Sequence, residues 1–429
     1  MLVNGAAVAS ADPLVTVLPA LVLILAAARL GGDLAERLGQ PAVLGELCVG
    51  VLLGNAGLFG VPSLSGLADN ATIDLLARLG VILLLFEVGL EATVRDMMRV
   101  GGRAFAVAVL GVVTPWLLGW GVGAWLLPNH SGYVHAFIGA TLTATSVGIT
   151  ARVLKDLGRA GTAEARIILG AAVIDDVLGL VVLGVITSVL ASADTGEGVS
   201  FSGTGLVFLK AAGFLVGALG LGVVVVPRLF RAASWLRGRD VLLTTGIVLC
   251  FGLGYGAAAM GLAPIVGAYA AGLILEEAHY EGFTRRGERP LAELVRPIAG
   301  LLAPVFFVVM GLRVDLRAFL QPGVLVLTLA LTLAALAGKQ ACALGAWRSR
   351  LDGLSIGIGM IPRGEVGLIF ANLGLTLTVH GERILDPVTY SAIVLMVMIT
   401  TFVTPPALKW SFRARRGPAP ARDDTPAGP

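Results

Sequence analysis

Residues 170–184 read GAAVIDDVLGLVVLG and place two adjacent aspartates, Asp175 and Asp176, in the middle of an apolar run. A charged residue at the centre of a bilayer costs about 2.5–3.5 kcal/mol on insertion scales. Two neighbouring acids at that depth have no evident structural benefit, so we interpret them as a functional site. Adjacent side chains on a helix point about 100° apart, so one aspartate can line a cavity while the other contacts a neighbouring helix.

The chain around this stretch has the composition of a membrane protein. Of its 429 residues, 56% are hydrophobic and 14% are charged, whereas soluble proteins carry about 25% charged residues. Apolar runs long enough to cross a bilayer recur along the chain, which excludes a large soluble α/β protein. We predict an all-α polytopic membrane protein with thirteen transmembrane helices. The expected spans are approximately residues 13–31, 41–59, 72–94, 104–127, 135–152, 167–190, 204–226, 240–259, 261–277, 294–312, 322–346, 354–377 and 388–408.

The segments that connect these spans lie alternately on the two sides of the membrane, and positive residues are distributed unevenly between the two sides. Most lie on one side, and the other side has only Arg78, Lys210, Arg313, Arg317 and Arg383. Cytoplasmic connections of membrane proteins are enriched in arginine and lysine. We therefore expect a multi-pass protein of the cell inner membrane, in contact with its lipids, with the N-terminus outside and the C-terminus in the cytoplasm.

An internal repeat is visible at a constant offset of 222 residues. Gly45, Gly50, Leu53, Gly89 and Leu90 correspond in this way to Gly267, Gly272, Leu275, Gly311 and Leu312. The offset separates the second span from the ninth and the third from the tenth. Seven spans is an odd number, so the two copies are expected to insert with opposite orientations. Inverted repeats are typical of secondary transporters, which bind their substrate near the midplane at interrupted helices.

The fifth and twelfth spans correspond when the offset is shortened by three residues, to 219. Both contain residues that interrupt a helix. Residues 141–150 read TLTATSVGIT, and Pro362 and Gly364 flank Arg363 in the twelfth span. Such breaks are tolerated at membrane depth only beside protein or a water-filled cavity. We predict two crossed, discontinuous helices, with a simple proline kink as the alternative. Arg363 and Glu365 together can neutralise the facing helix ends at such a crossing.

Polar groups from four spans are expected at a similar depth in the membrane. Asp176 and Lys339 are each about ten residues from the cytoplasmic end of their spans, which corresponds to about 14–15 Å at 1.5 Å per residue. Ser146 and Glu365 reach a similar depth. These groups are therefore expected to converge on one site.

The chemistry of this site follows from its groups. Carboxylate and hydroxyl oxygens suit hard cations, so we expect a monovalent metal cation at Asp175 and Asp176. A carboxylate pair that binds either a cation or protons exchanges the two by competition. A buried lysine that loses its carboxylate partner releases its proton readily. Two acids and Lys339 can thus exchange two protons for one sodium ion.

Several motifs resemble those of a known family. They are PAVLGEL at 41–47, LFEVGLE at 85–91, ATSVGIT at 144–150, Asp175-Asp176, Gly338-Lys339 and PRGEVGL at 362–368. With them the sequence resembles the monovalent cation:proton antiporter-2 superfamily, most closely the NapA-type sodium/proton antiporters. Gln340 departs from the small or apolar residue that usually follows the lysine.

The resemblance implies an NhaA/NapA-like antiporter fold, a homodimer and particular residue roles. Asp176 would be the principal ion ligand, Asp175 the partner of Lys339, and Thr145 and Ser146 would supply oxygen at the helix break. By position along the chain, the implied domains are 1–103 and 240–313 for dimerisation, 104–192 and 314–411 for the ion-transporting core, 193–239 for a linker helix and 412–429 for a disordered cytoplasmic tail.

The function expected from the sequence is electrogenic sodium/proton antiport, of the kind used in pH homeostasis. The alternative is potassium/proton antiport on the same scaffold, because these ligands do not discriminate between the cations. A sodium-coupled symporter is a weaker alternative. So is an intramembrane aspartyl protease, whose two aspartates must face each other from different helices. We expect no enzymatic activity, no cofactor and no nucleic-acid partner.

Overall fold

The structure is a computed structural model in which a defined part of the chain is described. The described residues are 13–59, 64, 66–67, 70–90, 94–195, 209–210, 213–214, 216–218, 220, 222, 224–236, 238, 240–275, 283, 288–314, 316–317, 323–347, 351–379 and 382–414. The expected tail at 412–429 lies largely outside this part, and the expected seventh span at 204–226 and linker at 193–239 lie partly outside it.

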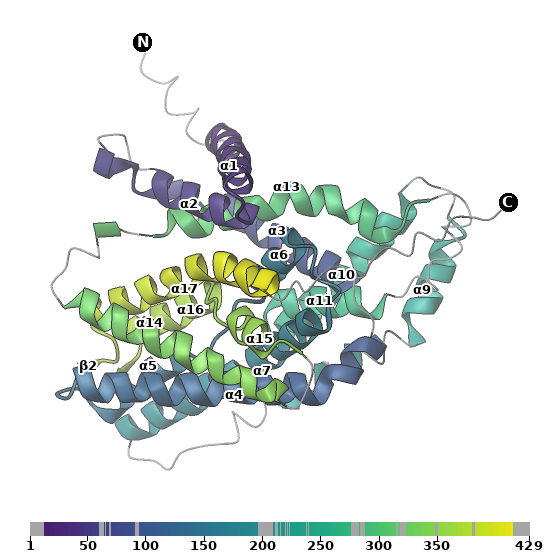
Figure 1. Ribbon diagram of the computed structural model, residues 1–429. Helices are drawn as coiled ribbons and strands as arrows, with labels where there is room; N and C mark the ends of the chain where they lie inside the picture. The colour runs from purple at the N-terminus through teal and green to yellow at the C-terminus, as the bar shows by residue number, and fades with distance from the viewer. Residues whose placement is uncertain are drawn as a thin grey trace, which may run out of the picture.

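The described residues form a mostly helical protein with one small antiparallel sheet, and Figure 1 shows the order of the elements along the chain. The elements are α1 (Pro13–Arg37), α2 (Ala42–Gly54), η1 (Ala56–Phe59), α3 (Ala71–Leu90), α4 (Val94–Leu126), α5 (Gly132–Thr141), α6 (Val147–Asp156), α7 (Ala163–Thr195), α9 (Val226–Ala233), α10 (Val241–Ala259), α11 (Pro264–Ile274), α13 (Leu291–Leu312), α14 (Val324–Gln340), η5 (Ala341–Ala346), α15 (Gly353–Gly359), α16 (Glu365–Thr376), β1 (Thr378–Val379), β2 (Glu382–Arg383) and α17 (Pro387–Ala414).

Six helices within the described residues are long and apolar enough to cross a membrane. They cover Leu14–Arg37, Val100–Leu126, Val241–Ala259, Leu291–Leu312, Val324–Ala346 and Pro387–Arg413. Shorter apolar helices, among them α2 and α11, accompany them. The protein is therefore a multi-pass membrane protein, as the composition predicted.

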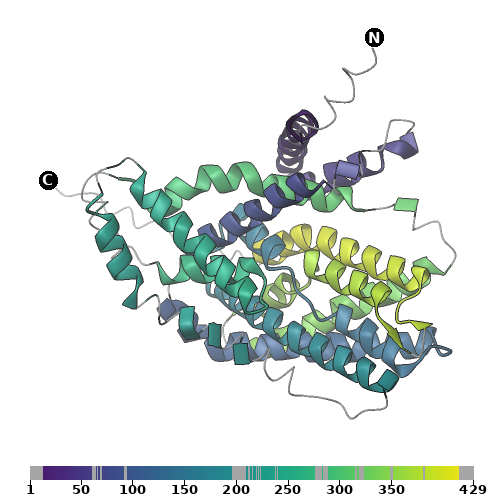
Figure 2. The same cartoon turned by 180° about the vertical axis from the view of Figure 1, so that it is seen from behind.

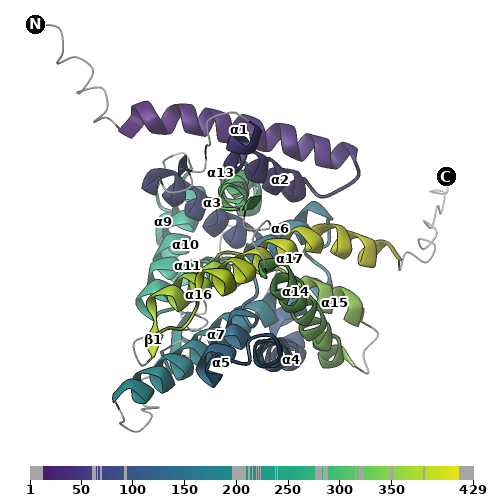
Figure 3. The same ribbon diagram turned by 90° about the vertical axis from the view of Figure 1, so that its left-hand side faces the viewer.

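The helices pack in two groups. One group, which we call the scaffold group, contains α1, α2, α3, α10, α11 and α13, and its largest contacts join α13 and α11 to α3 and α13 to α2. The other, which we call the site group, contains α4 to α7, η5 and α14 to α17, with its largest contacts between α4, α5, α7 and α14. Figures 1 and 3 show α1, α2 and α13 along one side of the molecule and α4, α5 and α14 along the opposite side. Figure 2 shows the same arrangement from behind.

Glycine residues allow the scaffold helices to approach closely, as small residues do in membrane proteins. A Cβ atom on Gly50 of α2 would lie 2.2 Å from the carbonyl oxygen of Val308 and 2.8 Å from Cα of Gly311, both on α13. A Cβ atom on Gly272 of α11 would likewise lie 2.8 Å from Cα of Gly89 on α3. Any larger residue at these positions would force the helices apart.

A second pair of close contacts involves the neighbouring helices of the same group. A Cβ atom on Gly45 of α2 would lie 1.9 Å from the carbonyl oxygen of Gly31 on α1. On Gly267 of α11 it would lie 2.1 Å from the carbonyl oxygen of Leu253 on α10. Thus α1 packs on α2 in the same way as α10 packs on α11.

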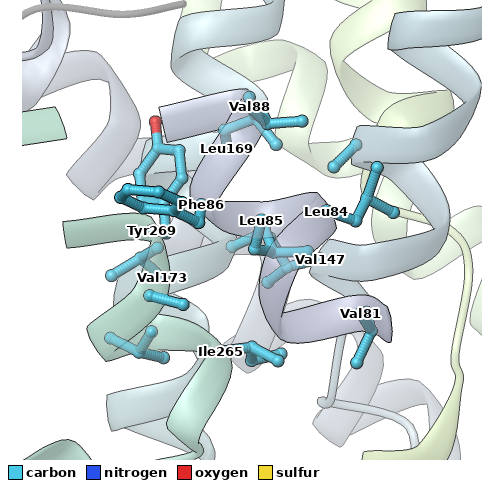
Figure 4. Packing of buried hydrophobic residues seen from close by; sticks show 14 of the residues in the cluster. Val81, Leu84, Leu85, Phe86, Val88, Val147, Leu169, Val173, Ile265 and Tyr269 are labelled. Atoms are coloured by element: carbon cyan, nitrogen blue, oxygen red, sulfur yellow. The ribbon is translucent and has the colours of Figure 1, made fainter. Parts of the chain in front are cut away.

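The two groups meet along an apolar seam at α3. Figure 4 shows Val81, Leu84, Leu85 and Phe86 of α3 beside Val147, Leu169, Val173, Ile265 and Tyr269, which belong to α6, α7 and α11. All of these side chains are buried in one cluster. The seam places α6 directly against the scaffold group.

Candidate ion-binding site

Two interrupted helices cross at the centre of the site group. Helix α5 ends at Thr141 and α6 begins at Val147, while α15 ends at Gly359 and α16 begins at Glu365. The backbone N–H of Ser146 donates to the carbonyl oxygen of Pro362 at 2.7 Å. The Thr150 hydroxyl donates to the Gly359 carbonyl oxygen at 2.7 Å. The two breaks therefore satisfy part of each other's backbone hydrogen-bonding capacity.

Arg363 lies at the crossing with its side chain fully buried. Its Nε donates to the carbonyl oxygen of Leu142 at 3.1 Å, and its Nη1 donates to the carbonyl oxygen of Ile361 at 2.9 Å. A second bond to Leu142 comes from Nη2. These carbonyls follow the C-terminal ends of α5 and α15, so the guanidinium compensates two negative helix ends. Glu365 is the first residue of α16, and its side chain lies outside the described part.

Lys339 of α14 and Asp175 of α7 form an ion pair beside this crossing. Lys339 Nζ lies 3.2 Å from Asp175 Oδ2, and both side chains are 0% exposed. The same Nζ donates to the carbonyl oxygen of Thr143 at 2.7 Å and to Thr145 Oγ1 at 2.7 Å. Three acceptors from two elements thus surround the ammonium group, which matches its three N–H donors.

The second oxygen of Asp175 differs from the first. Oδ1 is buried and has no hydrogen-bond partner among the described residues. Asp176, the next residue on α7, is half-buried rather than buried. The difference in exposure agrees with the expected splay of adjacent side chains on a helix. An unoccupied carboxylate oxygen in a buried site is a position where a cation or a proton would be favourable.

The structure brings together most of the residues singled out from the sequence. Asp175, Thr145 and Lys339 are in direct contact. Ser146 lies next to Gly364, where a Cβ atom would be 2.5 Å from Ser146 Oγ. Within the described part of the chain, no hydrogen bond joins Ser146 Oγ to Asp175.

Two further groups border the lysine and were not singled out from the sequence. The Thr143 contact uses a backbone carbonyl, which no side-chain pattern reveals. Gly111 of α4 lies so close that a Cβ atom there would be 3.4 Å from Lys339 Nζ. The sequence could have indicated this proximity to Lys339 only through the position of Gly111 within an apolar span. A glycine there also fits ordinary helix packing.

The fold and this buried charge site define a class of protein, a membrane carrier with crossed discontinuous helices. Residues 20–414 match the family described as "Sodium/hydrogen exchanger, transmembrane". The chain belongs to this family, which confirms the resemblance inferred from its motifs at the level of the family.

Individual relatives agree with this assignment. The chain is 39% identical to the high-affinity Na(+)/H(+) antiporter NhaS3 of Synechocystis sp., with 95% of this chain and 92% of the relative covered. It is 34% identical to the Na(+)/H(+)-K(+) antiporter GerN of Bacillus cereus, over 92% of this chain and 96% of GerN. The fold resembles that of the sodium proton antiporter MjNhaP1 from Methanocaldococcus jannaschii, with a TM-score of 0.62, 18% identity, and 94% and 97% of the two chains covered.

Proposed function

We propose that this protein is a secondary active antiporter that exchanges sodium ions for protons across the membrane. The observation that carries the proposal is the buried Lys339–Asp175 pair beside two crossed helix breaks, where Asp175 Oδ1 has no hydrogen-bond partner among the described residues. Relatives that match most of the chain are named as Na(+)/H(+) antiporters. The transported ions are substrates, and the proposal needs no cofactor and no enzymatic reaction.

The proposed mechanism is competition between a cation and protons at one site. Sodium binds at Asp176 and Asp175, with oxygen atoms of Thr145 and Ser146 near the break. When Asp175 turns toward the cation, Lys339 loses its carboxylate partner and releases its proton. After sodium leaves, one proton binds to Asp176 and a second binds to Lys339, which then pairs again with Asp175; the next sodium ion displaces both protons. Two protons move against one sodium ion, so each cycle transfers one net charge.

The proposal includes thirteen transmembrane helices built as inverted repeats. The paired glycine contacts support this arrangement, because the contact of Gly50 with Gly311 becomes the contact of Gly272 with Gly89 when each position is shifted by 222 residues. The same offset relates the carbonyls of Gly31 and Leu253. A two-fold relation between α2–α13 and α11–α3 explains why these glycines recur.

The proposed domains follow the two helix groups. The scaffold group corresponds to residues 1–103 and 240–313 and would form the interface of a homodimer. The site group corresponds to 104–192 and 314–411 and would move against it, with 193–239 as the linker. The excess of arginine on one side supports an external N-terminus and a cytoplasmic C-terminus in the inner membrane.

Potassium/proton exchange is the second candidate. It is favoured by one specific observation, the name of GerN as a Na(+)/H(+)-K(+) antiporter. Oxygen ligands alone do not separate the two cations, since selectivity depends on the size and rigidity of the site. An aspartyl protease is disfavoured because Asp175 and Asp176 are adjacent on one helix.

The test is proton flux in proteoliposomes under an imposed pH gradient, with sodium, lithium and potassium added in turn. We expect sodium and lithium to release protons from the loaded vesicles and potassium to do so weakly. Equal flux with potassium would favour the second candidate. No flux with any of the three cations would refute antiport.

A further inference from the structure

A second set of buried charges lies away from the ion-binding site and joins α6 to the scaffold group. Lys155 Nζ lies 2.5 Å from Glu87 Oε2, with side-chain exposures of 22% and 0%. Arg152 Nη2 lies 2.9 Å from Glu46 Oε1, with exposures of 13% and 4%. Glu46 is on α2 and Glu87 is on α3. One half of a broken helix is therefore fixed by charge to two helices of the other group.

Neighbouring contacts strengthen this attachment. Asp156 accepts a hydrogen bond from Arg152 Nε at 2.9 Å and another from the backbone N–H of Val43 at 3.4 Å. The guanidinium carbon of Arg152 lies 5.8 Å from the ring centroid of Phe307 on α13, within the range of a cation–π contact. Arg296 Nε adds a second cation 3.3 Å from Glu87 Oε1.

The corresponding half-helix of the other break carries no such charges. Adding 222 to positions 46 and 87 gives Ala268 and Val309. With the offset shortened by three residues, adding 219 to positions 152 and 155 gives Ala371 and Gly374. Helix α16 packs on α5 and α17, whereas α6 packs on α2 and α3 of the scaffold group as well as on α7 and α17. The attachment is thus specific to one of the two halves.

Separating α6 from α2 and α3 would leave the buried Glu46 without Arg152 and the buried Glu87 without Lys155, so that of the two cations paired with Glu87 only Arg296 of α13 would remain. Removing one partner of a buried pair is strongly destabilising, because the remaining charge stays uncompensated. We propose that Glu46, Glu87, Arg152 and Lys155 form an ionic latch. The latch holds the carrier in the state in which α6 is packed on α2 and α3. Because α16 has no counterpart of these ion pairs, loss of the latch favours the state in which α6 has moved away from α2 and α3. The inference rests on the proposed movement of the site group against the scaffold group, but its test measures conformation and not transport.

The test uses a buried thiol at the seam between α2 and α6. Val43 is fully buried and its backbone contacts Asp156. A cavity of about 300 Å³ lined by Gln40, Ala42, Asp156 and Lys409 lies beside it, so a hydrophilic maleimide can approach once the seam opens. Val43→Cys is made in the full chain with Cys48, Cys250 and Cys342 replaced by alanine. The control probe is Val308→Cys, which is equally buried but contacts Gly50 within the scaffold group.

The latch is then removed one pair at a time, so that neither Glu46 nor Glu87 stays charged without its partner on α6. The variants are Glu87→Gln with Lys155→Gln, and Glu46→Gln with Arg152→Gln. Lys155→Arg keeps the charge and is the matched variant. Asp74→Asn removes an ion pair with Arg313 elsewhere in the scaffold group and controls for charge loss as such.

In nanodiscs, we expect the maleimide to label position 43 about tenfold faster in either neutralised pair, the effect of a coupling of about 1.4 kcal/mol. The rate at position 308 should stay unchanged, and Lys155→Arg and Asp74→Asn should behave like the parent protein. An unchanged rate at position 43 in a folded pair variant would overturn the latch. An equal increase at position 308 would also overturn it, since that indicates general loosening. Failure of the parent protein to exchange sodium for protons would refute the proposed function and leave this readout intact.

Discussion

Among the described residues, two lysines pair with a fully buried carboxylate, and the two pairs differ in the exposure of the lysine and in the further partners of the carboxylate. Lys339 and Asp175 are both 0% exposed and lie 3.2 Å apart. Lys155 is 22% exposed and lies 2.5 Å from Glu87, which Arg296 also contacts. Asp175 Oδ1 has no hydrogen-bond partner within the described part of the chain, whereas both oxygens of Glu87 are paired.

This difference indicates what each pair is suited to do. A doubly paired carboxylate has little capacity for a further cation, so Glu87 is suited to hold two helices together. The Asp175 pair lies between interrupted helices, where backbone carbonyls and hydroxyls replace water. A buried ion pair adds little net stability compared with apolar residues, so its retention at this place is better explained by ion exchange.

The largest effect is expected for Asp176→Asn. This substitution should distinguish the ion-binding site most clearly from the region around Glu87. The amide keeps the shape of the side chain but loses its charge and its proton. We expect sodium-driven proton flux in proteoliposomes to fall to background while the purified protein elutes like the parent. Glu87→Gln, in the other region, should retain measurable flux. Flux like that of the parent protein in Asp176→Asn would refute the assignment of the ion ligand.

A smaller but selective effect is expected when each lysine is replaced by arginine. Lys339 is enclosed, with Gly111 close to its Nζ, and arginine keeps its proton under all physiological conditions. Lys339→Arg should therefore lower the flux by about tenfold or more. Lys155→Arg should stay within about twofold of the parent, because a partly exposed side chain can rearrange. Equal losses in the two variants would show that the pairs do not differ in role.

The smallest effect is expected for Thr145→Val, which removes one acceptor from Lys339 and keeps the shape of the side chain. A typical intramolecular hydrogen bond contributes about 0.5–1.5 kcal/mol net, and Lys339 keeps its acceptors on Thr143 and Asp175. We expect the sodium concentration for half-maximal flux to shift by about three- to tenfold, and Thr145→Ser to restore it. A parent-like value in Thr145→Val would show that this hydroxyl does not position the lysine for exchange.

Much of this account was predictable from the sequence, and the reasons are physical. Asp175, Asp176 and Lys339 stand out because a charge within an apolar span is costly. Pro362 and the hydroxyl-rich residues 141–150 marked both helix breaks for a similar reason. The family is confirmed, while the residue roles, the domain boundaries and the thirteen spans remain predictions.

Other features could not be read from the chain. Arg152 ends the expected fifth span at 135–152 and Lys155 follows it, but both lie in α6 and contact Glu46 and Glu87. Their partners are about 70 to 105 positions earlier in the sequence, and no local pattern indicates such pairing. The carbonyl of Thr143 was missed because backbone groups leave no trace in the sequence. The sequence placed Arg363 at the crossing. It did not predict that Arg363 contacts the ends of both α5 and α15.

The central claim, that Lys339 carries a proton in exchange with sodium, is tested most directly by the voltage dependence of transport. The measurement is sodium-driven proton flux in proteoliposomes, with and without valinomycin and potassium to clamp the voltage. One net charge per cycle corresponds to about 2.3 kcal/mol per 100 mV, so the flux of the parent protein should increase when the clamp is applied. Lys339→Gln should be either unaffected by the clamp or inactive. Parent flux that ignores the clamp, or a Lys339→Gln variant as voltage-sensitive as the parent, would contradict the account.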